Sequence, residues 1–172
     1  MRKTELAMSM DIEIGSNEIK MQNVVIPNMT LLLDGGVYLF VLDGLPIYVG
    51  EANVFSSRIT DHLMTLKEQP EYFGFQNLVG VHKLKYFILR SGLPYKAYKK
   101  EGRKRSSDKN REERRRLESK FIEEYQPIVQ RPRTNEKYPR SRKSDGMITD
   151  GDIKGKFVSQ FVKDPSPYKL IQ

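Results

Sequence analysis

The clearest pattern along the chain is a pair of short apolar runs separated by an Asp-Gly step. Residues 36–42 are mostly aliphatic or aromatic, and residues 45–49 have a similar composition after Asp43 and Gly44. Short runs bounded by turn-forming residues predict buried strands, and Asp-Gly favours the tight turn of a hairpin. We therefore expect an antiparallel hairpin over residues 36–49.

The register of this hairpin decides where its two tyrosines lie. If Asp43 and Gly44 alone form the loop, the alternation of side chains along a strand puts Tyr38 and Tyr48 on opposite faces. A loop of odd length, with a bulge at Gly44 or its neighbour, would put both phenols on one face. The sequence leaves both registers open.

A helix is predicted next, over residues 54–67, because apolar positions recur there at helical spacing. At about 100° per residue, Arg58 and His62 lie about 40° and about 80° from Val54, inside the apolar arc. One interpretation is an arginine that reaches water or a core carboxylate, beside a hydrogen-bonded core histidine. The other is a pair of functional side chains aimed at a shared site.

A later helix, over residues 110–125, carries a carboxylate in a comparable position. Glu118 lies about 100° from Leu117, within the arc that also holds Phe121, whereas the other glutamates of this helix fall outside it. A buried ion pair between Glu118 and Arg58 is the structural explanation, and it would be weak evidence of function. A third strand is predicted between the two helices, over residues 81–89.

The remaining segments divide the chain into three parts. We read residues 1–34 as an N-terminal arm packed on a core that spans residues 35–130. Residues 68–80 read as a loop or irregular helix, and residues 131–172 as a basic extension too short for an independent domain.

Composition limits the class of protein. A chain of 172 residues suits one domain, and the absence of cysteine excludes disulfides and thiolate metal sites. There is no apolar stretch of the length that spans a bilayer, so we expect a cytoplasmic protein without a membrane partner.

The positive charge is concentrated in two segments. The net charge is +8, and residues 96–120 hold twelve Lys or Arg against five Asp or Glu. Residues 131–143 hold six basic residues and one acidic residue. A basic run is often only a solvated surface, but two such runs in an otherwise acidic chain favour a polyanion partner.

Taken together, these motifs resemble the GIY-YIG nuclease superfamily. The resemblance lies in residues 36–38 (Gly-Val-Tyr), residues 48–50 (Tyr-Val-Gly), Arg58 and His62 on the following helix, and Glu118 on a later one. It covers about residues 36–130. The family's usual asparagine after the last helix has no counterpart in register.

The resemblance implies an α/β fold: a small, three-stranded, mainly antiparallel sheet flanked by helices, with a basic insertion at residues 96–116 and extensions at both ends. It also implies roles for the site. Glu118 would hold one Mg²⁺ or Mn²⁺, and Arg58 the scissile phosphate. Tyr38 would be the general base or would orient the attacking water, with Tyr48 and His62 completing the network. An ordinary phenol is a poor base at neutral pH, so a nearby cation would have to lower its pKa.

The implied function is metal-dependent hydrolysis of double-stranded DNA. Short basic extensions around one catalytic core most resemble a type II restriction endonuclease, for which a homodimer or homotetramer is consistent with cutting two strands. The alternatives are a homing, mobile-element or structure-selective nuclease of the same family, and a nucleic-acid-binding module without catalysis. The expected DNA-binding residues are Lys99, Lys100, Arg103, Lys104, Arg105, Arg114, Arg115, Arg131, Arg133, Arg140 and Arg142.

Overall fold

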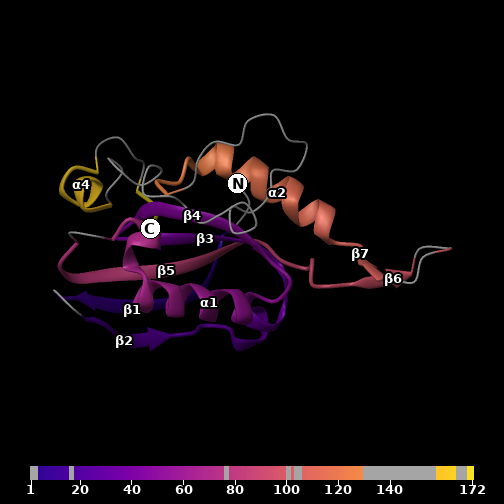
Figure 1. The fold of residues 1–172 in the computed structure, drawn as a ribbon, viewed down its shortest axis with the longest axis horizontal. Coiled ribbons are helices and arrows are strands. Elements are labelled where there is room, and N and C mark those ends of the chain that lie inside the picture. Colours follow the sequence, from indigo (N-terminus) through magenta and orange to yellow (C-terminus); the bar gives the residue numbers. More distant parts are fainter. Residues whose placement is uncertain are drawn as a thin grey trace.

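A five-stranded antiparallel sheet forms the centre of the computed structural model, with strand order β2-β1-β5-β3-β4 (Figure 1). The structure describes residues 4–15, 18–75, 78–99, 102, 106–129, 158–165 and 170–172. The strands of the sheet are β1 (Glu5–Ile14), β2 (Ile19–Val25), β3 (Gly36–Leu42), β4 (Leu45–Ala52) and β5 (Gly80–Arg90).

Two long helices pack on this sheet, and both match their predicted ranges to within a residue. They are α1 (Phe55–Glu68) and α2 (Arg111–Tyr125). Shorter elements complete the described part of the chain: the 3₁₀ turns η1 (Met29–Leu33) and η2 (Pro70–Phe73), the two-stranded ribbon of β6 (Ala97–Lys99) and β7 (Ser106–Asp108), and α4 (Val158–Lys163).

The sheet has five strands where three were predicted, and the N-terminal arm supplies the extra two. Met10, Ile12 and Ile14 of β1 are buried on one face and alternate with more exposed residues. This strand pairs with β5 along most of its length, so the backbone groups on both sides of β5 are used in the sheet. The first segment of the chain is therefore part of the core.

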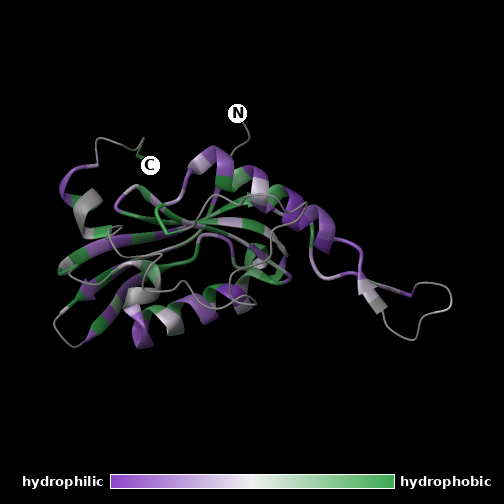
Figure 2. Ribbon diagram, turned by 45° about the horizontal axis from the view of Figure 1, so that its top comes forward, coloured by the Kyte–Doolittle hydropathy of each residue, from purple (hydrophilic) through white to green (hydrophobic). Residues whose placement is uncertain are grey.

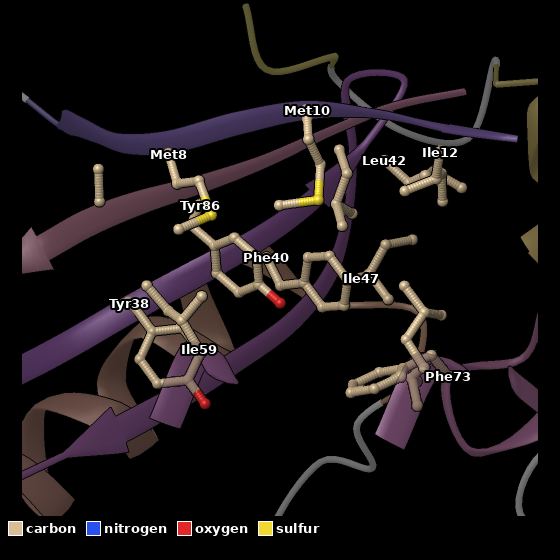
Figure 3. Close-up of a cluster of buried hydrophobic side chains, with 14 of the residues drawn as sticks. Met8, Met10, Ile12, Tyr38, Phe40, Leu42, Ile47, Ile59, Phe73 and Tyr86 are labelled. Carbon is tan, nitrogen blue, oxygen red and sulfur yellow. The ribbon is translucent and has the colours of Figure 1, made fainter. Parts of the chain in front are cut away.

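Each face of the sheet carries its own apolar cluster, because neighbouring residues of β3 point in opposite directions. Tyr38 and Phe40 belong to the cluster that contains Ile59 of α1. Leu39 belongs to the other cluster, with Leu117 of α2. The helices α1 and α2 thus cover opposite faces, and Figure 3 shows the packing in the first cluster.

The turn between β3 and β4 is a two-residue loop. Leu42 pairs with Leu45, and both loop residues have positive φ angles, 49° at Asp43 and 83° at Gly44. This is the backbone of a type I′ turn, which matches the twist of the flanking strands. The carboxylate of Asp43 also lies 2.6 Å from Nδ1 of His82, so the turn is tied to β5.

A β-bulge in β4 then places both tyrosines on one face. Phe40 pairs with Tyr48, and the register shifts between Phe40 and Val41, which leaves Ile47 as the inserted residue. The loop has the even length that alone would separate the phenols, but the bulge restores Tyr48 to the face of Tyr38. The outcome is the shared face, reached by a different route from the odd loop considered above.

The ribbon of β6 and β7 projects from the body of the molecule beyond the start of α2 (Figures 1 and 2). It falls within the predicted basic insertion. No helix in the described ranges is long and apolar enough to cross a membrane.

Candidate active site

Tyr38 and His62 meet in the core between β3 and α1. Tyr38 is 1% exposed and His62 7% exposed, and the Tyr38 hydroxyl is hydrogen-bonded to Nε2 of His62. Their ring centroids are 5.6 Å apart. The helical spacing had placed His62 inside the apolar arc of α1, and its burial confirms that placement.

Tyr48 joins this pair from β4. Its ring centroid lies 6.4 Å from that of Tyr38 and 5.3 Å from that of His62, and the tyrosine and histidine rings meet at an interplanar angle of 62°. Unlike Tyr38, it is only partly buried. The three rings form a compact cluster with Tyr38 at its buried end, and we call Tyr38, Tyr48 and His62 the tyrosine–histidine cluster.

The glycines of the two tripeptide motifs are required by close contacts. A Cβ atom on Gly50 would overlap the hydroxyl of Tyr38 and would lie 2.8 Å from the ring of Tyr48. A Cβ atom on Gly36 would overlap the carbonyl oxygen of Arg90 on the neighbouring strand. The glycine at position 50 thus lets Tyr38 cross over β4 and reach His62.

Electrostatics at the cluster favour a neutral Tyr38. Burial raises its pKa well above the usual value, and the neighbouring phenol of Tyr48 adds to this effect, whereas Arg58 opposes it. We had expected a catalytic Tyr38 to need a cation that lowers its pKa. Arg58 acts in that direction, but burial outweighs it.

Arg58 lies beside the cluster on the first turns of α1. Burial disfavours its charged form, but Tyr38, Tyr48 and Glu51 outweigh that cost and raise the pKa of the guanidinium. Arg58 therefore stays positively charged, next to the phenols, at a half-buried position where an anion could reach it.

Glu118 approaches the same region from α2, on the other side of the sheet. It is 2% exposed, between the buried Leu117 and Phe121, as its helical angle predicted. Its negative charge contributes to the raised pKa of Tyr38, so the two groups are in electrostatic reach. The five residues of the predicted constellation thus come from β3, β4, α1 and α2.

A second buried polar network lies next to this site and is centred on Arg114. Its Nε atom donates to Glu51 at 2.7 Å, and Nη2 pairs with Asp108 at 2.5 Å and also bonds to Asn53. Nη1 donates to the carbonyl of Leu93 at 3.0 Å. One arginine therefore joins α2 to the end of β4 and to β7.

Arg114 was predicted to contact DNA, and the structure corrects this. The side chain is 1% exposed, and carboxylates already occupy its guanidinium. The burial of Arg114 could have been predicted from the sequence, because Arg114 lies about 60° from Leu117, within the apolar arc of the helix. Buried arginines are normally paired, so the same test that singled out Glu118 would have found it.

A cleft of about 670 Å³ opens beside Arg58. It lies between the start of α1, the end of β7 and the first two turns of α2, and Arg111, Arg115 and Tyr95 also line it. Neither Arg111 nor Tyr95 was singled out from the sequence, because an arginine in a basic run and a lone loop tyrosine have no distinctive pattern. Only the fold brings them next to Arg58.

The predicted DNA-binding residues differ in where the structure places them. Lys99 is exposed on β6, and Arg115 lines the cleft. The others, apart from Arg114, lie outside the described residues: Lys100, Arg103, Lys104, Arg105, Arg131, Arg133, Arg140 and Arg142.

The resemblance predicts one Mg²⁺ or Mn²⁺ held by Glu118. The described residues contain no group of three or more His, Asp or Glu side chains placed to hold a metal. Mg²⁺ keeps several of its waters and needs one or two carboxylates together with substrate phosphate oxygens. Glu118 is the predicted carboxylate ligand, and its binding of Mg²⁺ stays a prediction.

Comparison with known proteins gave no match to a family model, a curated protein or a solved structure.

Proposed function

We propose that this protein is a metal-dependent DNA endonuclease of the GIY-YIG type that hydrolyses phosphodiester bonds, most similar to a type II restriction enzyme. The observation that carries the proposal is that Arg58 interacts electrostatically with Tyr38 and Tyr48 of the tyrosine–histidine cluster and also lines a cleft together with further arginines. A structural core gains nothing from gathering these polar groups in one place, because each must be desolvated there.

In this proposal Arg58 binds the scissile phosphate. A guanidinium remains charged at all physiological pH values, and its planar fork matches two phosphoryl oxygens. Arg58 lines the cleft and also interacts electrostatically with both tyrosines, so a phosphate held by Arg58 would lie near the cluster. The negative charge that develops during hydrolysis would meet this guanidinium.

The tyrosine–histidine cluster would position the attacking water and accept its proton. A buried, neutral Tyr38 suits the orienting role better than that of a free phenolate base. His62 accepts the Tyr38 hydrogen bond at Nε2 when its proton is on Nδ1, and an imidazole is a common general base in enzymes. The more exposed Tyr48 would contact the water or the phosphate directly.

Glu118 would hold the divalent ion, which supplies charge neutralisation at the phosphate and stabilises the leaving oxygen when bound. The burial of Glu118 within α2 fixes the position of its carboxylate. A rigid carboxylate is what a site with a single protein ligand requires.

Double-stranded DNA is the proposed substrate because the two basic segments of the sequence can neutralise backbone phosphates. Cutting both strands at one position requires two active sites, so we propose a homodimer or homotetramer as the working assembly.

Cleavage of supercoiled plasmid and linear phage DNA tests the proposal. We expect discrete fragments with Mg²⁺ or Mn²⁺, none with a chelator, and a rate lower by about 10² or more in Arg58→Ala. Lys67→Ala, at an exposed position of the same helix, is the matched control and should cut normally. Salt-sensitive DNA binding without metal-dependent cleavage would contradict the nuclease and leave a nucleic-acid-binding module.

A further inference from the structure

The proposed chemistry uses only Arg58 among the residues that line the cleft. The cleft continues from Arg58 along the first two turns of α2, where Arg111 and Arg115 line it, and Tyr95 lies opposite on the chain that leads to β6. Tyr95 is 51% exposed, although it lies in a mainly charged environment. The cleft has a volume of about 670 Å³, which is in the range of small-molecule sites, so it has room for one or two nucleotides at a time.

The carboxylates of the cleft do not make it repel anions. Glu51 and Asp108 line it, but Arg114 binds both from the buried side, at 2.7 and 2.5 Å. Burial tends to raise the pKa of Asp108, but its hydrogen bond from Arg114 and those from two backbone N–H groups lower it overall. Arg114 therefore already neutralises both carboxylates in part.

Three arginines are left to face an incoming anion. Arg58, Arg111 and Arg115 line the cleft, and with Arg114 beneath they outnumber the lining carboxylates, including Glu112. Arg111 and Arg115 are one helical turn apart, about 6 Å between Cβ atoms. Side chains at that spacing can bind neighbouring phosphates of one strand, with guanidinium groups suited to the oxygens.

We propose that this cleft binds one nucleic-acid strand beside the scissile phosphate, with Arg111 and Arg115 on successive backbone phosphates and Tyr95 packed on a base. This inference rests on the proposed nuclease function and adds the path of the cut strand. Stacking on an exposed tyrosine tolerates any base, so this contact supplies affinity without sequence preference.

Binding of a labelled duplex and of its single strands, measured without divalent metal, tests the phosphate contacts. We expect Arg111→Ala/Arg115→Ala to raise Kd roughly tenfold or more at low salt and to reduce the slope of log Kd against log salt by about 1.8. The matched control is Arg116→Ala/Lys120→Ala, which removes the same charge from the same helix at exposed positions outside the cleft. Circular dichroism confirms that both variants fold.

Tyr95 gives an independent measurement. We expect Tyr95→Ser to raise Kd by roughly fivefold or more, whereas Tyr95→Phe, which retains the ring, should bind like the wild type.

The outcomes separate this inference from the proposed function. If the wild type cuts DNA and the cleft variant has the Kd and salt slope of its control, the path of the strand is wrong and the nuclease stands. If Tyr95→Ser binds like Tyr95→Phe, the stacking contact is wrong. A wild type that neither binds nor cuts DNA overturns both proposals.

Discussion

At the scale of single residues, the site depends on a missing side chain as much as on those present. The Tyr38 hydroxyl reaches His62 because position 50 has no Cβ atom in its path. The sequence could not show this contact, since Tyr38 and Gly50 are opposite each other only in the observed register. The glycine that ends the motif at residues 48–50 is therefore required on steric grounds, independently of any family resemblance.

Replacing Gly50 by alanine should displace Tyr38 and break its contact with His62. We expect the free energy of unfolding of Gly50→Ala to fall by about 1–3 kcal/mol, as for other overpacked cores, with a parallel loss of cleavage. Urea unfolding measures the first effect. In a Tyr38→Leu background the same substitution should cost less, and an equal cost in both backgrounds would show that the two positions are not in contact.

Tyr86 is a buried tyrosine that, unlike Tyr38, has no role in the proposed chemistry. Its hydroxyl has no hydrogen-bond partner among the described residues, and its ring is stacked on Phe40 at 4.8 Å. Burial raises the pKa of this phenol far above its usual value. The folded protein therefore keeps a proton that the unfolded chain releases above about pH 10.

Tyr86→Phe should accordingly stabilise the protein. We expect a gain of about 1 kcal/mol in the free energy of unfolding at pH 7, because no desolvated hydroxyl remains. The contribution of the neutral phenol is present below about pH 10 and is lost as the pH rises further. Above about pH 10 the free energy of unfolding should therefore fall less steeply in the variant than in the wild type. The difference between the two slopes should be about 1.4 kcal/mol per pH unit. Urea titrations at several pH values, with Tyr95→Phe as control, measure both the gain at pH 7 and the slope above about pH 10. A variant with the stability and slope of the wild type would contradict the prediction.

At the scale of elements, the spacing of apolar residues predicted the helices and strands whose formation depends on local sequence. The β3–β4 hairpin, the β5 strand and both long helices came directly from apolar spacing, and the burial of His62 and Glu118 followed from helical angles. The bulge at Ile47 could not be predicted, because an inserted β-branched residue looks like any other strand residue. The pairing of the N-terminal arm with β5 could not be predicted, because the local pattern does not say which strand such a segment joins.

Arg114 makes the position of α2 relative to the sheet and to β7 sensitive to one side chain. Arg114→Leu would leave Glu51 and Asp108 without their shared partner, and we expect unfolding to become easier by about 3–5 kcal/mol. Arg116 offers the matched control: it pairs with Glu113 on the exposed side of the same helix, so Arg116→Leu should cost about 0–1 kcal/mol. Equal destabilisation by the two changes would contradict the structural role of Arg114.

At the scale of the whole molecule, the sheet separates the groups that the proposed chemistry must combine. The phenols and His62 belong to the face covered by α1, whereas Glu118 belongs to the helix on the other face. The cleft lies where β4 ends and the two helices begin, and of the five predicted site residues Arg58 alone lines it. Charge composition predicted a polyanion partner, but only the fold shows which arginines line an opening.

The most direct test of this account is metal-dependent cleavage by Glu118→Gln, measured beside DNA binding. Glutamine preserves the shape and burial of the side chain but removes the charge that would hold the metal. We expect cleavage with Mg²⁺ to fall by about 10² or more while DNA binding is retained, and Glu124→Gln, an exposed glutamate of the same helix, to cut like the wild type. Undiminished cleavage by Glu118→Gln would contradict the proposed site.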